Sequence, residues 1–180
     1  MGRLFVALRL PPVLRDSLAA LHREVPGVRW VPPGHLHLTI RFIGSENPSF
    51  IKEALREVVS PSVTVSFERV RLFPRSSRPR VLAATIANTR ELRTLHSQIE
   101  SALEHTGIKP EDRPFRPHVT LARCKGAEPG SLKPLLEEVT VPSASVEIDA
   151  FHLFESHLHP EGAKHTVLET YLLGAQSWFG

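Results

Sequence analysis

Hydrophobic and polar positions in the first half of the chain follow two alternating periods, which predict strands and helices in turn. An apolar run that Pro11 and Pro12 stop is typical of a short buried strand. Apolar residues then recur at helical spacing in two segments, and Asn47-Pro48 before the second of them is a favourable helix start. The expected elements are a strand over 4–10, a helix over 14–25, a strand over 36–43, a helix over 47–58 and a strand over 63–67.

The second half repeats this order of elements. A strongly amphipathic segment predicts a helix that Gly107 closes, because glycine is the residue type most suited to a helix C-terminus. Pro134 falls in the next helical segment, where it is expected to be tolerated only in the first turn. The expected elements are a strand over 81–87, a helix over 92–103, a strand over 118–121, a helix over 132–139, a long strand that starts over 146–150, and a last strand over 167–173.

The repeated order predicts an internal duplication with a period near 80 residues. We expect a single domain over residues 1–180, with copies at approximately 3–73 and 80–155 and a C-terminal strand after them. Such a period is too long for a solenoid and suits two pseudo-symmetric lobes. The expected fold class is α+β, with mixed or antiparallel sheets and the helices on the outside.

Composition narrows the class of protein. A chain of 180 residues with 41% hydrophobic residues can bury a core without disulfides or a structural metal, and its charged fraction of 23% is not that of a disordered protein. The single cysteine, Cys124, excludes an intramolecular disulfide and a thiolate zinc site, which favours a reducing cytoplasm. The apolar runs are far shorter than the ~20 residues of a membrane-spanning helix, and too short for a signal peptide.

The type of positive charge is more informative than its amount. The net charge of +3 indicates little about partners, but 17 of the basic residues are arginine and only 5 are lysine. Arginine suits bidentate contacts to phosphate, although a GC-rich genome produces the same excess.

The most informative pattern, His-apolar-Thr-apolar, occurs twice, beginning at His37 and at His118, with an offset of 81 residues (118 − 37). Because successive strand residues point to opposite faces, each His shares a face with its Thr while the apolar residues face the core. One copy is a weak signal, since a lone histidine on a strand is usually structural. Two copies at equivalent positions of a duplicated unit indicate function. The polar faces carry His35, His37, Thr39 and Arg41 in the first strand, and Arg116, His118 and Thr120 in the second.

This pair of motifs suits phosphodiester chemistry. A threonine hydroxyl can donate a hydrogen bond to a phosphate oxygen, and an imidazole gives or takes a proton near neutral pH. Two imidazoles on opposite sides of one phosphate would supply a general base and a general acid without a metal or another cofactor.

With these motifs the chain resembles the 2H phosphoesterases, specifically the RNA 2′,3′-cyclic phosphodiesterases, also called 2′-5′ RNA ligases. The resemblance implies a bilobal fold with the active site in a central cleft. It also implies metal-independent hydrolysis of a 2′,3′-cyclic phosphate on RNA or a nucleotide to a 2′-phosphomonoester, with reversal to 2′-5′ ligation as a secondary activity. It covers nearly the whole chain, through RLFVALRLP at 3–11, RWVPPGHLHLTIRFIG at 29–44, RPRVLAATI at 78–86, RPFRPHVTLAR at 113–123 and FHLFESHL at 151–158.

The resemblance also implies a role for each matched residue. His37 would be the acid that protonates the leaving 3′ oxygen, and His118 the base that activates water. Thr39 and Thr120 would hold the phosphate, and Arg123 would contact it. The chain departs from the family after Gly162, where an aromatic residue is often found and Ala163-Lys164-His165 stands instead.

Arg123 conflicts with strict alternation, which points it away from the face of His118. We therefore expect the second strand to end or to bulge near Ala122, so that Arg123 turns back. Arg41 and Arg116 have the matching parity and are the alternative phosphate contacts.

Other features favour other functions less strongly. His152, His157, His159 and His165 suggest a partial metal site and hence a metallohydrolase, but no acidic residue completes a spacing and we expect a solvated loop. The run Arg69, Arg71, Arg75, Arg78 and Arg80 is also expected to be a solvated loop, or else an electrostatic approach for an RNA end. Trp30 could stack on a base, although core packing suits it better. A non-catalytic module that binds RNA ends would not need both histidines. No membrane and no obligate protein partner is indicated.

Overall fold

The computed structural model describes residues 2–174, so the expected domain of 1–180 extends past the described residues at both ends. The described part has the expected α+β composition. In chain order its elements are β1 (Arg3–Arg9), α1 (Pro12–Ala19), β2 (Arg29–Trp30), the 3-10 turn Pro33–His35, β3 (His37–Gly44), α2 (Pro48–Leu55), β4 (Val63–Val65), β5 (Phe67–Phe73), β6 (Val81–Ile86), α3 (Arg90–Glu104), β7 (His118–Arg123), α4 (Pro129–Glu138), β8 (Val146–Ile148), β9 (Ala150–His159) and β10 (Gly162–Leu172).

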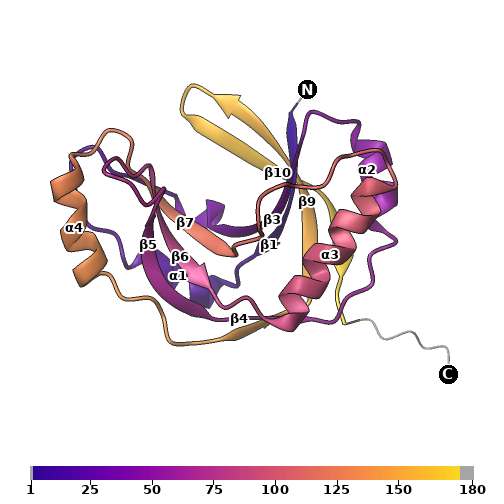
Figure 1. The fold of residues 1–180 in the computed structure, drawn as a ribbon, viewed down its shortest axis with the longest axis horizontal. Coiled ribbons are helices and arrows are strands. Elements are labelled where there is room, and N and C mark those ends of the chain that lie inside the picture. The colour runs from indigo at the N-terminus through magenta and orange to yellow at the C-terminus, as the bar shows by residue number, and fades with distance from the viewer. Residues whose placement is uncertain (1, 175–180) are drawn as a thin grey trace.

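The strands of the two halves form one antiparallel sheet in the order β10-β9-β1-β3-β7-β6-β5, and β2 pairs with the end of β7 (Figure 1). The halves exchange their later strands: β5 of the first half pairs with β6, and β9 of the second half pairs with β1. One lobe is therefore β10-β9-β1-β3 and the other is β7-β6-β5. The two lobes meet where Leu38 of β3 pairs with Val119 of β7. A separate pair, β4 with β8, joins the halves again.

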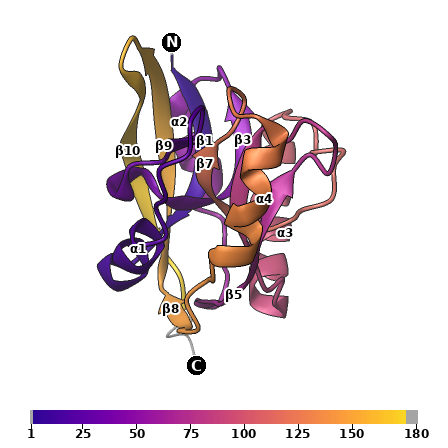
Figure 2. The same cartoon turned by 90° about the vertical axis from the view of Figure 1, so that its left-hand side faces the viewer.

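The helices pack against one face of this sheet. The main core cluster combines buried residues of α1, α2, α3 and α4, among them Leu14, Ile51, Leu95 and Leu132, with alternate strand residues such as Leu38 and Val119. On the opposite face of the sheet a small cluster of Phe5, Ala7 and Phe154 is buried. The α4 helix lies at one end of the molecule and α2 and α3 at the other, and α1 lies between them (Figures 1 and 2).

Local signals explain where α2 begins and where α3 ends. The Asn47 side chain accepts a hydrogen bond from Ser49 N at 2.9 Å, and Pro48 is the first residue of α2, as expected. Gly107 follows α3 with φ of +89°, a conformation that glycine adopts without strain. The α1 helix ends at Ala19, earlier than expected, although Leu21 and Val25 still pack against the core.

Pro134 contradicts one expectation, because it is the sixth residue of α4 and not part of its first turn. A proline at that position cannot donate a backbone hydrogen bond to the carbonyl of Gly130. The helix is nevertheless held against the core on both sides of the proline, by Leu132 and Leu135, which are buried.

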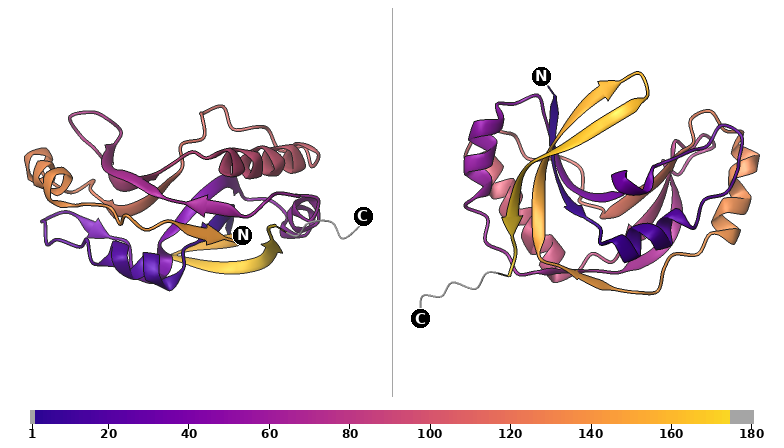
Figure 3. Two further views of the ribbon diagram at one scale, coloured as in Figure 1. Left: turned by 90° about the horizontal axis from the view of Figure 1, so that it is seen from below. Right: turned by 180° about the vertical axis from the view of Figure 1, so that it is seen from behind.

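Parts of two segments expected to be solvated loops are strands, whereas Arg75, Arg78 and Arg80 lie in the loop between β5 and β6, as expected. Arg69 and Arg71 belong to β5, because the strand expected over 63–67 breaks at Ser66 and the chain continues as a new strand in the main sheet. The four C-terminal histidines belong to the β9–β10 hairpin, drawn in yellow in Figure 3. In the part of the chain that the structure describes, every helix is too short or too polar to cross a membrane.

Candidate active site

The two histidine motifs lie side by side at the junction of the lobes. His37 and His118 are the first residues of β3 and β7, which pair antiparallel through Leu38 and Val119. Continuing this register by one residue on each side places His37 opposite Thr120 and His118 opposite Thr39. Side chains directly opposite each other share a face and lie about 5 Å apart at Cβ. The four polar side chains therefore form one group on the face away from the helices.

Both imidazoles are held by the same kind of hydrogen bond. Nδ1 of His37 lies 2.7 Å from the backbone oxygen of His35, and Nδ1 of His118 lies 2.7 Å from the backbone oxygen of Arg116. A carbonyl oxygen can only accept, so Nδ1 carries the proton in each neutral ring. The lone pair is then on Nε2, the nitrogen that can take a proton from a substrate or, once protonated, give one.

A β-bulge brings Arg123 to the face that carries the histidines. This bulge was expected, because strict alternation would point Arg123 away from that face. Thr120 and Ala122 pair with consecutive residues of β6, which leaves Leu121 as the extra residue. Arg123 then pairs with Val81, and Val81 shares its face of β6 with the partner of Thr120. The side chain of Arg123 is exposed on the face that carries His118 and Thr120.

The first motif has the same bulge, and this bulge makes the expectation for Arg41 wrong. Thr39 and Arg41 pair with consecutive residues of β1, which leaves Ile40 as the extra residue and reverses the alternation after it. Phe42 therefore takes the place in the first motif that Arg123 takes in the second, five residues after the histidine. Its ring is 62% exposed on the site face.

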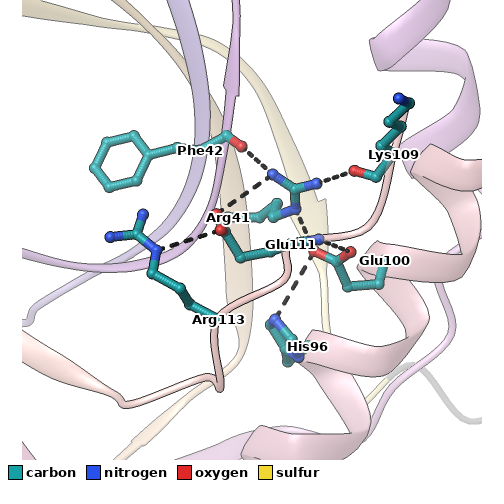
Figure 4. A network of polar contacts seen from close by, with 7 residues as sticks. All are labelled: Arg41, Phe42, His96, Glu100, Lys109, Glu111 and Arg113. Atoms are coloured by element: carbon teal, nitrogen blue, oxygen red, sulfur yellow. Dashed lines mark hydrogen bonds and ion pairs between the residues drawn. The ribbon is translucent and has the colours of Figure 1, made fainter.

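Arg41 instead points to the other face, where it is buried. Its guanidinium donates to Oε1 of Glu100 on α3 and to the backbone oxygens of Phe42 and Lys109, and lies 3.9 Å from Glu111 (Figure 4). All of these partners belong to the protein, so Arg41 serves the fold and is not a phosphate contact. Arg116 is exposed before β7, and it is its backbone oxygen that orients His118.

Aromatic rings that the sequence pattern did not single out surround the histidines. Measured between ring centroids, Phe5 lies 5.2 Å from His37 and 5.9 Å from Phe42, and Phe73 lies 5.8 Å from His118. His165 of β10 is also here, at 5.6 Å from His37. The strand alternation of Phe5 and the equal five-residue offset of Phe42 and Arg123 are the signals that could have found two of them.

Further positive charge lies on the same face. Arg9 pairs with His37 across β1 and β3, and Arg69 and Arg71 pair across β5 and β6 with the residues that face His118 and Thr120. Within residues 2–174, none of these three arginines, nor Arg123, forms an ion pair. Trp30 packs against the core and donates to the oxygen of Arg23 at 2.8 Å, which fits core packing.

The sequence model of the family described as 2′-5′ RNA ligase superfamily matches residues 8–160. The chain belongs to this superfamily. It is similar to two proteins named RNA 2′,3′-cyclic phosphodiesterase. The one from Aeropyrum pernix is 36% identical, with 86% of this chain and 90% of the relative covered, and the one from Thermus thermophilus is 34% identical, with 95% and 90% covered.

Solved structures agree with this membership of the 2′-5′ RNA ligase superfamily. The crystal structure of TT0787 of Thermus thermophilus has a TM-score of 0.78 at 28% identity, covering 94% of this chain and 97% of that one. The crystal structure of E. coli LigT complexed with 3′-AMP has a TM-score of 0.77 at 26% identity, covering 96% and 98%. The α+β fold is that of the 2H phosphoesterases.

Two imidazoles at the candidate active site, those of His37 and His165, have a lowered affinity for protons. Burial lowers the pKa of His37, against the hydrogen bond to the His35 backbone, which raises it; the neighbouring His35, Arg123 and His118 lower it further. Burial beside His37 and His35 lowers the pKa of His165 to about 4. Both rings are therefore neutral at pH 7 when no anion is bound.

Stability should consequently fall in acid. Burial also lowers the pKa values of His96 and His152. A histidine with a lowered pKa binds fewer protons in the folded than in the unfolded state, so protonation favours the unfolded state. This loss of folding stability is absent above pH 6.5 and grows as the pH falls toward 4. We expect the melting temperature to be highest above pH 6.5 and to drop progressively between pH 6.5 and 4. His165→Gln should make this drop smaller, whereas His159→Gln, at an exposed position of the same hairpin, should leave it unchanged. Equal curves for all three proteins would contradict the prediction.

Proposed function

We propose that this protein hydrolyses 2′,3′-cyclic phosphate ends of RNA or of nucleotides and leaves a 2′-phosphomonoester. The observation that carries the proposal is the pair of imidazoles held by equivalent carbonyl contacts, at the first residues of two strands that pair through Leu38 and Val119. A phosphate between them would meet an Nε2 on each side and a hydroxyl donor from each strand.

In the proposed reaction His118 accepts a proton at Nε2 from a water molecule as the water oxygen bonds to phosphorus. Attack in line with the P–O3′ bond breaks that bond, and the protonated Nε2 of His37 gives its proton to the leaving 3′ oxygen. One P–O bond forms and one breaks, and one proton is taken up and one released. Thr39, Thr120 and Arg123 donate hydrogen bonds to the non-bridging oxygens, where negative charge accumulates.

The lowered pKa of His37 gives substrate binding a second role. The acid must be protonated, whereas the isolated site favours the neutral ring. A bound phosphate places negative charge beside His37 and raises the pKa again, because an opposite charge within a few ångströms favours the cation. His37 would therefore acquire its proton together with the substrate.

The substrate class is supported by the names of the relatives in Aeropyrum and Thermus, and the nucleotide by the 3′-AMP complex of LigT. The exposed ring of Phe42 beside the site offers a base a stacking surface. Reversal would join a 2′,3′-cyclic end to a 5′-hydroxyl, since the same two imidazoles serve both directions. Cytoplasmic location is inferred from the single cysteine, whose thiol is buried.

The two halves, approximately 3–73 and 80–155, are proposed to be copies of one ancestral unit that forms a single domain. The same element order, the same histidine–carbonyl contact and the same bulge after each threonine support this proposal.

Chelation and product analysis test the function together. The purified protein with excess EDTA should open an oligonucleotide that ends in a 2′,3′-cyclic phosphate at an undiminished rate. The product should resist a phosphatase specific for 3′ esters, because P–O3′ cleavage leaves the phosphate on O2′. Activity that EDTA removes and zinc or manganese restores would favour the metallohydrolase alternative. A 3′ ester would exchange the roles of His37 and His118.

A further inference from the structure

A cavity of about 740 Å³ lies at the end of the sheet beyond β5, β6 and β7. One wall is the β5–β6 loop, residues 74–80, and the other is the connection from β7 to α4, residues 125–129. Figure 1 shows these two segments side by side, and the hydrogen bond from Cys124 N to the backbone oxygen of Arg80, 2.7 Å long, joins their bases.

Both walls start from residues of the candidate active site. Pro74 follows Phe73, whose ring contacts that of His118, and Lys125 follows Arg123 by two residues. Because of the bulge at Leu121, Arg123 lies only two β6 positions beyond Thr120, about 7 Å along the strand, and Lys125 lies two residues further on. The cavity is therefore next to the place of the reacting phosphate but too far from it to hold the same phosphate group.

The charges that line the cavity are mostly positive. Arg78, Arg80 and Lys125 line it, against one carboxylate, that of Glu128. Among the ion pairs between residues 2 and 174, none includes any of these four side chains. Like charges so arranged repel one another, and an anion between them removes the repulsion. The first turn of α4 begins at Pro129 in the same lining and adds the positive end of its dipole.

We propose that this cavity binds the backbone phosphate of an RNA strand one or two nucleotides upstream of the cyclic end. The direction follows from the chemistry of the substrate: the cyclic phosphate is the 3′ terminus, so every other phosphate of the strand lies on its 5′ side. This inference rests on the proposed function, and it makes oligonucleotides better substrates than mononucleotides.

Substrates of different length distinguish the contribution of this cavity from that of the catalytic residues. A nucleoside 2′,3′-cyclic phosphate has no upstream phosphate, whereas a short oligonucleotide with the same terminal nucleotide has several. In the variant Arg78→Ala/Arg80→Ala/Lys125→Ala, kcat/KM for the oligonucleotide should fall roughly tenfold or more, mainly through KM, and its salt dependence should weaken. Turnover of the mononucleotide should change less than about twofold. Arg75→Ala, in the same loop but outside the lining, is the matched control and should behave as the unaltered protein.

A gain-of-affinity variant guards against misfolding. Glu128 makes no side-chain hydrogen bond to cap α4, so Glu128→Gln removes the one negative charge of the lining at little cost to the helix and should lower KM for the oligonucleotide alone. Equal losses on both substrates, or none, would overturn the proposal. If the unaltered protein turns over neither substrate, the proposed function has failed, and the cavity is then tested by fluorescence anisotropy with the labelled oligonucleotide. The triple variant should bind it more weakly than Arg75→Ala does, and equal affinity would overturn the proposal.

Discussion

Replacing His37 or His118 by alanine should lower kcat on a 2′,3′-cyclic phosphate about 10²–10⁴-fold, the range for the loss of one general acid or base. Each ring presents Nε2 to the shared face because its Nδ1 is tied to a carbonyl, and alanine removes that proton carrier without altering the core side of the strand. The double variant should lose less than the product of the two single losses, because the imidazoles act as one unit.

The matched control for these variants is His35→Ala. His35 contributes its backbone oxygen to His37, which the substitution keeps, so kcat should fall far less than in His37→Ala. Residual activity also identifies the roles through its pH profile. Without the base His118 the acidic limb should disappear, and without the acid His37 the alkaline limb. Near-normal turnover in either histidine variant would remove that residue from the mechanism, and exchanged limbs would exchange the roles.

Element types and core faces could be predicted because they depend on local periodicity. In α3, the apolar spacing predicted the buried side, and Leu92, Leu95 and Ile99 are buried. The helix start at Asn47-Pro48 was predictable for the same reason, since the cap forms between residues two positions apart. The grouping of His37, Thr39, His118 and Thr120 followed from alternation within each strand together with the repeat.

The residues after each threonine could not be placed by alternation. A single extra residue, Ile40 or Leu121, reverses the faces beyond it, and neither is a glycine or another type that marks a bulge. The matching parity of Arg41 was therefore misleading, while the conflict at Arg123 did indicate the bulge. Placing both motifs in one register would have matched Phe42 with Arg123 and exposed the error.

Long-range pairing explains the remaining differences. The C-terminal histidines lack a clear apolar alternation, whereas Arg69 and Arg71 alternate with Val70 and Leu72 but were interpreted together with the arginines of the following loop. They become strands because β5 and β9 each add to the lobe built by the other half of the chain. No local pattern shows which half a strand will join, since the partners are far apart in sequence.

The substitution of Arg41 should have the second large effect, which is on the stability of the fold and not on the reaction. Its buried guanidinium links β3 of one lobe to α3 and to the following loop through Glu100, Lys109 and Glu111. His96 also approaches the Glu100 carboxylate, at 3.9 Å, and stacks on Phe115. Removing the guanidinium would leave the Glu100 carboxylate and two backbone oxygens with fewer donors at a site with little access for water, which is the costly way to break a buried ion pair.

Arg41→Ala should therefore lower the free energy of unfolding by about 3–5 kcal/mol, the usual cost of removing one partner of a buried pair. For a domain of this size each kcal/mol corresponds to roughly 2–4 °C in melting temperature. Arg41→Lys should recover only part of the loss, because one ammonium cannot reach partners on three sides as a guanidinium does. Arg123→Ala is the control: its exposed side chain should be removable with a change under about 1 kcal/mol, although turnover falls. If urea denaturation shows Arg41→Ala to be as stable as Arg123→Ala, the network around Arg41 does not hold β3 to α3, and the face it occupies must be assigned another role.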